Sequence, residues 1–97
     1  MKNRILHIAA LMIAASVSTA HAGCYADYKA KKDGPLQLHY GVIELPQSIC
    51  RDQARAASVI APRLASAGWT LLNVLSVFDD DGLQGRKASA GRYYLRF

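Results

Sequence analysis

The chain has 97 residues and a formal net charge of +5, and 52% of its residues are hydrophobic. This length allows one small domain and excludes a multidomain enzyme. Its two cysteines exclude a zinc site built from four cysteines, and their spacing matches no zinc finger or zinc ribbon.

Residues 1–22 have the pattern of a cleavable secretory signal peptide. Lys2 and Arg4 begin it, and a nearly uninterrupted apolar run over residues 5–17 follows, which is too short to remain as a membrane span. Small residues at the −3 and −1 positions predict cleavage after Ala22. We therefore expect a periplasmic protein without a transmembrane anchor after cleavage. Its net charge falls to +3, because the segment removes two basic residues and no acidic residue.

The two cysteines, Cys24 and Cys50, are predicted to form a disulfide in the oxidising compartment that export implies. Closing the intervening chain stabilises a small domain by about 3–4 kcal/mol on the chain-entropy model. A lipid anchor on Cys24 is the alternative, since this residue lies just after the predicted cleavage site. His21 argues against lipidation, because the lipid-modification motif has leucine at that position, and lipidation would also leave Cys50 unpaired.

Residues 24–45 predict a β-hairpin. Residues 24–31 alternate between apolar and polar side chains, residues 32–35 contain an Asp-Gly turn followed by proline, and residues 36–45 alternate again. We expect Gly41 to mark a bulge or the close approach of another group. The side chains predicted to point inward are Ala26, Tyr28, Ala30, Leu36, Leu38, Tyr40 and Val42.

A helix is predicted to follow the hairpin, with Ser48 as its N-cap and Gly68 at its end. Apolar side chains recur on one face, whereas Pro62 lies on the polar face, where a proline either kinks the helix or splits it. Residues 69–78 form the most apolar strand, and hydrophobic residues occupy both of its faces. That pattern is typical of a central strand that is buried on both sides.

The last two segments complete the expected sheet. Residues 79–90 are polar and contain glycine, which predicts a loop, and residues 91–97 alternate as a final strand. The predicted fold is α+β, with a single, mainly antiparallel four-stranded sheet in ββαββ order and one helix packed on one face. Because one helix covers only one face, we expect the second, partly apolar face of the sheet to be uncovered.

Two parts of the chain resemble bacterial sequences. Residues 67–74 (AGWTLLNV) and 93–97 (YYLRF) resemble a family of short bacterial domains of unknown function. That family runs strand, helix, strand, strand, with a Gly-Trp-x-Leu turn after the helix, and the match spans about residues 36–97. Thr70 stands where the family usually has an acidic residue. Residues 25–41 are similar to uncharacterised exported proteins of proteobacteria. Both resemblances support the fold and imply no activity.

Few residues are suited to catalysis or metal binding. His39 is the only histidine left after cleavage, and we expect it to be half-exposed on the strand face away from the helix, without an orienting carboxylate. The three aspartates at 79–81 do not follow the spacing of a calcium loop, and no glutamate follows them. We therefore expect a solvated loop tip there, balanced by Arg86 and Lys87, and predict no catalytic residue, no metal site and no cofactor.

The sequence thus predicts a non-catalytic binding or interaction module that uses the uncovered sheet face. The candidate interaction residues are Tyr25, His39, Arg92, Tyr94 and Arg96. The expected partner is a second copy of the chain or another periplasmic protein, with an anionic envelope polymer or lipid as a further alternative. Nucleic acid is not expected, because export separates the protein from it. Two alternatives stay open: a small hydrolase-like or ligand-modifying enzyme centred on His39, and an envelope protein lipid-anchored through Cys24.

Overall fold

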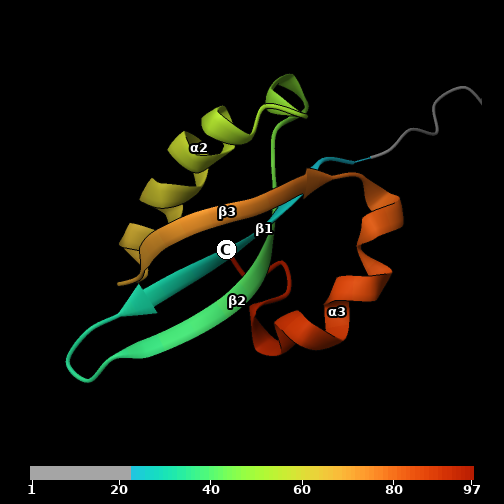
Figure 1. Cartoon of the computed structure of the whole chain (residues 1–97). Coiled ribbons are helices and arrows are strands. Elements are labelled where there is room, and N and C mark those ends of the chain that lie inside the picture. The colour runs from blue at the N-terminus through green and yellow to red at the C-terminus, as the bar shows by residue number, and fades with distance from the viewer. Residues whose placement is uncertain (1–22) are drawn as a thin grey trace, which may run out of the picture.

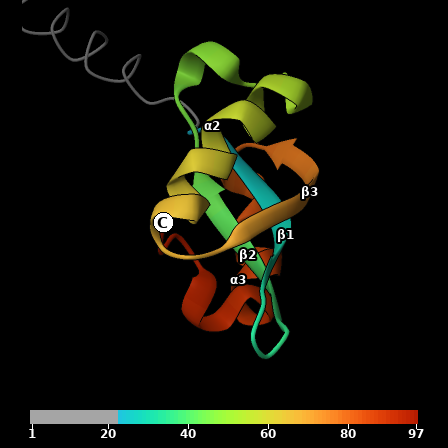
Figure 2. The same ribbon diagram turned by 90° about the vertical axis from the view of Figure 1, so that its left-hand side faces the viewer.

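The computed structural model describes residues 23–97. The predicted signal peptide and cleavage site fall in residues 1–22 and lie outside the described residues. The elements, in chain order, are β1 (Tyr25–Lys32), β2 (Gln37–Glu44), the 3₁₀ turn η1 (Gln47–Ile49), α2 (Gln53–Ser66), β3 (Thr70–Phe78), the 3₁₀ turn η2 (Asp80–Gly82), α3 (Gln84–Ala90) and the 3₁₀ turn η3 (Gly91–Tyr93). Figures 1 and 2 show α2 and α3 on different sides of the sheet and the β1–β2 turn projecting beyond both helices.

The sheet has three antiparallel strands in the order β2-β1-β3, so β1 is its central strand (Figure 1). β3 pairs with β1 through two irregularities, at which Leu72 and Leu75 have no partner residue in β1. These bulges leave the two leucines 49% and 40% exposed. The prediction that residues 69–78 form a central strand is therefore wrong. Strand β3 lies at the edge of the sheet, and part of its apolar surface faces solvent at the bulges.

The protein is α+β as predicted, but the four-stranded ββαββ sheet is wrong. Residues 79–90, expected to be a loop, contain η2 and α3, because the residues from Gln84 to Ala90 are mostly alanine and long unbranched side chains that favour a helix. Residues 91–97, expected to be a strand, form η3 and an end that makes one isolated bridge to β2. Leu95, with a φ of 54°, interrupts the extended conformation that a strand requires.

Helix α2 begins later than predicted. Its N-cap is Asp52, whose Oδ1 accepts a hydrogen bond from the backbone N–H of Arg55 at 3.0 Å. Ser48, the predicted N-cap, lies instead in turn η1. Pro62 lies on the exposed side of one continuous helix, so the proline does not split it. After the helix, Gly68 has a φ of 87°, which lets the chain turn back into β3.

The main core lies between the sheet and α2. Its buried residues are Cys24, Ala26, Tyr28, Ala30, Ile43, Leu45, Ile49, Ala56, Ile60, Leu64, Trp69 and Val74. On β2, the side that faces α2 includes His39, Gly41 and Ile43, which pair with Ala30, Tyr28 and Ala26. The prediction that Leu36, Leu38, Tyr40 and Val42 point toward the helix is therefore wrong. Successive residues of a strand point to opposite faces, so an error of one residue in choosing the inward-facing set assigns every side chain of β2 to the wrong face.

Helix α3 covers part of the opposite sheet face, which is therefore not uncovered as predicted (Figure 2). Val42 and Ala90 are both buried on this side of the sheet. The part of the same face near the β1–β2 turn stays exposed, and Leu38 is 65% exposed there. The expected open face is thus reduced to one end of the sheet.

The predicted disulfide is confirmed. Cys24 is bonded to Cys50, with the two Cα atoms 5.7 Å apart, and the bond joins the start of β1 to the segment that leads into α2. A disulfide is compatible with an exported protein. Within residues 23–97, no helix is long and apolar enough to cross a membrane.

Candidate functional site

His39 lies within a group of aromatic rings on the α2 side of the sheet. Its ring stacks on Tyr93 with the centroids 3.7 Å apart and meets Trp69 edge-on at 4.3 Å. Tyr28 and Phe97 complete the group, with centroids 5.4 Å and 6.0 Å from that of His39. We call these five residues the aromatic cluster. His39 is 8% exposed, so the prediction of a half-exposed histidine on the other face is wrong.

Gly41 makes room for the aromatic cluster. It lies opposite Tyr28 in the β1–β2 ladder, and a Cβ on Gly41 would come within 2.6 Å of the Tyr28 Cζ. Without that side chain, the tyrosine ring lies across β2 and its hydroxyl comes 2.9 Å from Nε2 of His39, at hydrogen-bond distance. The predicted close approach at Gly41 is therefore confirmed.

The surroundings of His39 keep its ring neutral at pH 7. Burial, and to a smaller extent the positive charge of Lys32, lowers the pKa of His39 to about 4. Burial also raises the pKa of the Tyr28 hydroxyl, which stays protonated. Nδ1 of His39 is buried and has no hydrogen-bond partner in the described part of the chain. A general base needs a carboxylate that orients it and access to substrate, and this histidine is instead enclosed by other rings.

The residues after α3 bring two arginines to the aromatic cluster. A bridge between Tyr94 and Val42 holds this segment along the outer edge of β2. Tyr93 and Phe97 pack against the core from there, with their ring centroids 6.2 Å apart. The residues that flank these two rings are Arg92 and Arg96.

The two arginines line a pocket of about 280 Å³ beside the aromatic cluster, which we call the basic pocket. Its lining residues are Lys32, Gln37, Ala67, Trp69, Arg92, Tyr93, Arg96 and Phe97. The Lys32 Nζ lies 4.5 Å from the centroid of the Trp69 ring. The guanidinium carbons of the two arginines lie 5.4 Å from the Tyr93 centroid and 6.0 Å from the Phe97 centroid. Each of the three cations is therefore close to an aromatic ring, which attracts it.

The charges of the basic pocket all have the same sign. No acidic side chain lines it, and within residues 23–97 none of its three cations forms an ion pair. Cations gathered around one concave surface create a positive potential, which favours an anionic ligand. The amide of Gln37 adds a group that can donate hydrogen bonds to such a ligand. The pocket is chemically suited to binding an anion.

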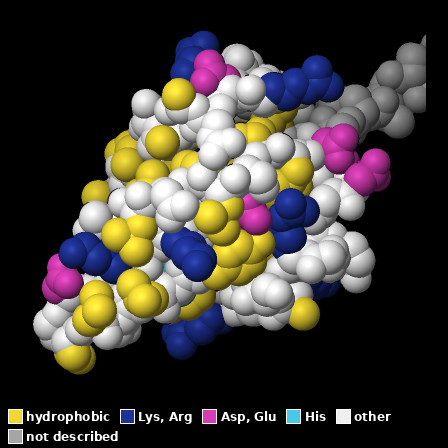
Figure 3. All heavy atoms as spheres, in the orientation of Figure 1, with side chains coloured by type: hydrophobic (Ala, Val, Ile, Leu, Met, Phe, Trp, Pro, Cys, Tyr) yellow, Lys and Arg dark blue, Asp and Glu magenta, His cyan; other side chains and the backbone are white. Residues whose placement is uncertain are grey.

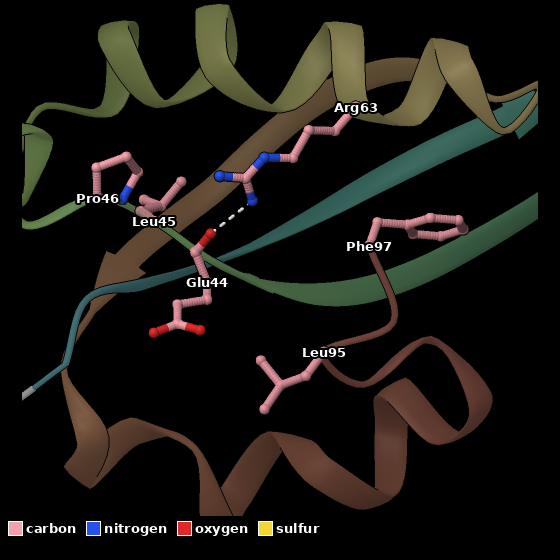
Figure 4. Close-up of a pocket in the computed structure, with 6 residues that line it drawn as sticks. All are labelled: Glu44, Leu45, Pro46, Arg63, Leu95 and Phe97. Carbon is pink, nitrogen blue, oxygen red and sulfur yellow. Dashed lines mark hydrogen bonds between the residues drawn. The ribbon is translucent and has the colours of Figure 1, made fainter.

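A larger groove of about 370 Å³ shares Phe97 with the basic pocket (Figure 4). Figure 4 shows Arg63 reaching from α2 toward Glu44, whose backbone carbonyl accepts a hydrogen bond from the Arg63 Nη1 at 2.7 Å. Leu95 lies on the other side of the groove. Because the groove contains one arginine, already hydrogen-bonded, and one glutamate, its charges are mixed. The basic pocket is therefore the better site for an anion.

A buried polar cluster on the opposite sheet face was not predicted from the sequence. Asp27, which is 6% exposed, accepts hydrogen bonds from Tyr40 at 2.8 Å, Ser76 at 2.6 Å and the Arg86 Nε at 3.0 Å. Burial alone would raise the pKa of Asp27, but the hydrogen bonds from Ser76, Tyr40 and Arg86 outweigh it and lower the pKa. Arg86 also lies over the Phe78 ring, 3.9 Å from its centroid. The cluster fastens α3 to the sheet.

The structure separates the five predicted interaction residues. Arg92 and Arg96 line the basic pocket, and His39 belongs to the aromatic cluster next to it. Tyr94 lies at the outer edge of β2. Tyr25 lies at the opposite end of β1 from the turn, where its ring stacks on Phe78. These residues therefore do not form one surface.

Lys32, Gln37 and Trp69 are pocket residues that the sequence analysis missed. Lys32 was assigned to a turn and Trp69 to the most apolar strand, and neither assignment pointed to a ligand. The signal available in the sequence is the alternation of aromatic and basic residues over residues 92–97. That alternation predicted a strand, although it places arginines around a pocket.

The three aspartates at 79–81 do not converge on one point. Asp79 Oδ1 accepts a hydrogen bond from the backbone N–H of Asp81 at 3.0 Å, and Asp80 Oδ1 accepts one from the N–H of Gly23 at 3.1 Å. Arg86, which was expected to balance these aspartates, pairs with Asp27. In residues 23–97, no group of three or more His, Cys, Asp and Glu side chains is placed to hold a metal ion.

No family model, curated protein or solved structure matches the chain. The resemblance of residues 36–97 to a family of short bacterial domains therefore stays a prediction.

Proposed function

We propose that this protein is an exported, non-catalytic binding module that holds an anionic group of its ligand in the basic pocket. The observation that supports this most directly is the gathering of Lys32, Arg92 and Arg96 around one pocket that has no acidic residue. Three like charges around one pocket repel one another, and a bound anion offsets that repulsion because it attracts each of the three cations.

The size of the basic pocket indicates which part of a ligand it holds. Its volume of about 280 Å³ lies just below the range of roughly 300–1,000 Å³ that is typical of sites for drug-sized molecules. A sulfate, phosphate or carboxylate group with a small attached chain or ring suits this space. Guanidinium groups such as those of Arg92 and Arg96 can donate paired hydrogen bonds to these anions.

The state of His39 supports a binding role over a catalytic one. It is the only histidine in the described residues, and a hydrolase-like mechanism would need it as a base near its ordinary pKa. Its pKa is instead lowered to about 4, and rings of Tyr93 and Trp69 cover it. A substrate would have to displace part of the aromatic cluster to reach the histidine.

Export is the second part of the proposal. The disulfide between Cys24 and Cys50 is compatible with an oxidising compartment, and residues 1–22 have the pattern of a signal peptide. A lipid anchor on Cys24 would need the same sulfur that the disulfide uses. We therefore favour a periplasmic protein over a lipid-anchored one.

Trp69 provides a direct test of anion binding, because it is the only tryptophan in the chain and it lines the basic pocket. The experiment is a fluorescence titration of the exported, disulfide-bonded protein with sodium sulfate, at an ionic strength held constant with sodium chloride. We expect a saturable change in the Trp69 emission. The double variant Arg92→Gln/Arg96→Gln should weaken sulfate binding about tenfold or more, since it removes two of the three cations.

Arg55→Gln is the matched control, because Arg55 is exposed on α2 and lies outside the basic pocket. It removes one positive charge, against two in the double variant, and should leave sulfate binding unchanged. Equal weakening by the control and the double variant would mean that sulfate responds to net charge and not to the pocket. A change in emission that never saturates, or that chloride reproduces, would contradict the proposal.

A further inference from the structure

The β1–β2 turn end of the molecule exposes three leucines. Leu36 and Leu38 are 63% and 65% exposed, and Leu72 of β3 is 49% exposed. Leu38 and Leu72 line a shallow hollow of about 220 Å³ together with Lys29 and Tyr40. We call Leu36, Leu38 and Leu72 the leucine patch. Figure 3 shows apolar side chains at this projecting end, interleaved with lysine or arginine side chains.

Lysines lie among these leucines. Lys31 pairs with Leu38 across the hairpin, and Lys29 pairs with Tyr40, so both lysines lie on the same sheet face as Leu38. Lys29 is exposed, and Lys31 forms an ion pair with the exposed Asp33 at 3.3 Å. Long lysine side chains can keep their charge in water while their stems lie along an apolar surface. The patch is thus apolar at its centre and basic around it.

The three aspartates at 79–81 lie at the end of the sheet away from the leucine patch. The aspartates at 79–81 follow the end of β3, which pairs with the start of β1, whereas the leucine patch lies at the other end of β1. Eight residues of extended strand place the two ends roughly 25 Å apart. This separation of charge favours an orientation in which the turn end approaches an anionic surface.

We infer that the leucine patch docks on an anionic lipid surface, with the leucines entering the interface and Lys29 and Lys31 lying among the head groups. Apolar insertion combined with attraction between basic side chains and anionic lipids is a general mode of reversible membrane association. This surface is separate from the basic pocket, so the inference does not rest on the proposed anion site.

Charge favours lipid over a second copy of the chain as the occupant. A symmetric contact between two leucine patches would bring Lys29 and Lys31 of both copies together, and these like charges would repel one another. An anionic lipid surface offers the opposite charge. A projecting turn also needs no complementary cavity when it enters a fluid interface, whereas a protein partner would have to provide one.

The test measures co-sedimentation of the exported, disulfide-bonded protein with vesicles. One set of vesicles contains phosphatidylcholine and phosphatidylglycerol in equal parts, and the other contains phosphatidylcholine alone. We expect binding to the anionic vesicles and little to the neutral ones. The double variant Leu38→Gln/Leu72→Gln should lower the partition coefficient about tenfold or more, because it removes two of the three leucines of the leucine patch.

Leu75→Gln is the matched control. Leu75 lies at the second bulge of the same strand, is 40% exposed and is not part of the leucine patch. It should leave vesicle binding unchanged, and the double variant should keep the sulfate response of Trp69, which separates this surface from the basic pocket. Wild-type protein that binds neither vesicle, or both equally, would overturn the inference. So would equal binding by the double variant and the wild type, or a wild-type dimer that the double variant converts to a monomer.

Discussion

Replacing His39 with glutamine should change how the stability of the protein depends on pH. Burial holds the pKa of His39 at about 4 in the folded protein, whereas the unfolded chain takes up the proton near pH 6.5. Above pH 6.5 the ring is neutral in both the folded and the unfolded state, so the difference in pKa does not change the free energy of unfolding. As the pH falls from 6.5 to about 4, the unfolded state binds more protons, so the free energy of unfolding decreases. The expected loss is about 3 kcal/mol, at about 1.4 kcal/mol for each pKa unit.

The assay is urea unfolding of wild-type protein and His39→Gln between about pH 7 and about pH 4.5. Glutamine keeps a polar group near the Tyr28 hydroxyl and does not titrate. The pKa of Asp27 is lowered, so the stability that this carboxylate contributes is present above pH 3.8 and is lost only at lower pH, outside the range tested. The variant should therefore lose much less stability than the wild type across this range. Equal losses in the two proteins would refute the argument that His39 is buried and neutral.

Three further variants test the contacts that stabilise the fold. Gly41→Ala should destabilise the protein by about 1–3 kcal/mol in urea unfolding, because its methyl group would clash with a buried tyrosine ring. Arg86→Gln leaves the Asp27 carboxylate buried without its cation, so we expect the free energy of unfolding to fall by about 1–3 kcal/mol. Relative to the wild type, amide exchange should accelerate more in α3 than in β1. Replacing Cys24 and Cys50 with serine should cost about 3–4 kcal/mol, and unchanged unfolding would mean that the disulfide is dispensable.

Local patterns in the sequence predicted the elements whose signals are short-range. The hairpin followed from alternation around an Asp-Gly turn, and the helix followed from its apolar stripe. Gly41 was predicted to mark either a bulge or a close approach, and the structure shows the close approach, to the ring of Tyr28. The disulfide followed from there being two cysteines, Cys24 and Cys50.

The prediction failed where two faces or two distant segments had to be compared. On β2, Leu38 and Tyr40 looked more hydrophobic than His39 and Gly41, yet the polar-looking pair faces the helix. The buried histidine is accommodated because its ring stacks on Tyr93 and its Nε2 lies at hydrogen-bond distance from a tyrosine hydroxyl of the neighbouring strand, although its Nδ1 has no partner in the described residues. Asp27 was not singled out in the sequence, because its cation, Arg86, lies 59 residues away in a segment whose polar residues and glycines had predicted a loop.

The same long-range arrangement connects the basic pocket to His39. The positive charge of Lys32 is one of the two causes that lower the pKa of His39, and Lys32 also lines the basic pocket. An anion bound beside Lys32 offsets that charge, so it should raise the pKa of His39. Linkage then requires the reverse effect, in which protonation of His39 strengthens anion binding. We therefore expect sulfate affinity to increase as the pH falls from about 5 toward 4, the pKa of His39 in the folded protein.

Sulfate suits this test because it stays dianionic across the range in which His39 titrates. The measurement follows the ring protons of His39 by NMR through a pH titration, with sulfate and with chloride at equal ionic strength. Burial is the larger cause of the lowered pKa, and sulfate does not change burial, so the pKa should rise by less than one unit and the affinity by less than tenfold. In Lys32→Gln the effect of sulfate on His39 should shrink. Saturable sulfate binding without any change in the titration of His39 would contradict the coupling. A change in affinity well above tenfold would mean that the anion opens the aromatic cluster to water, because the charge of one lysine cannot account for more.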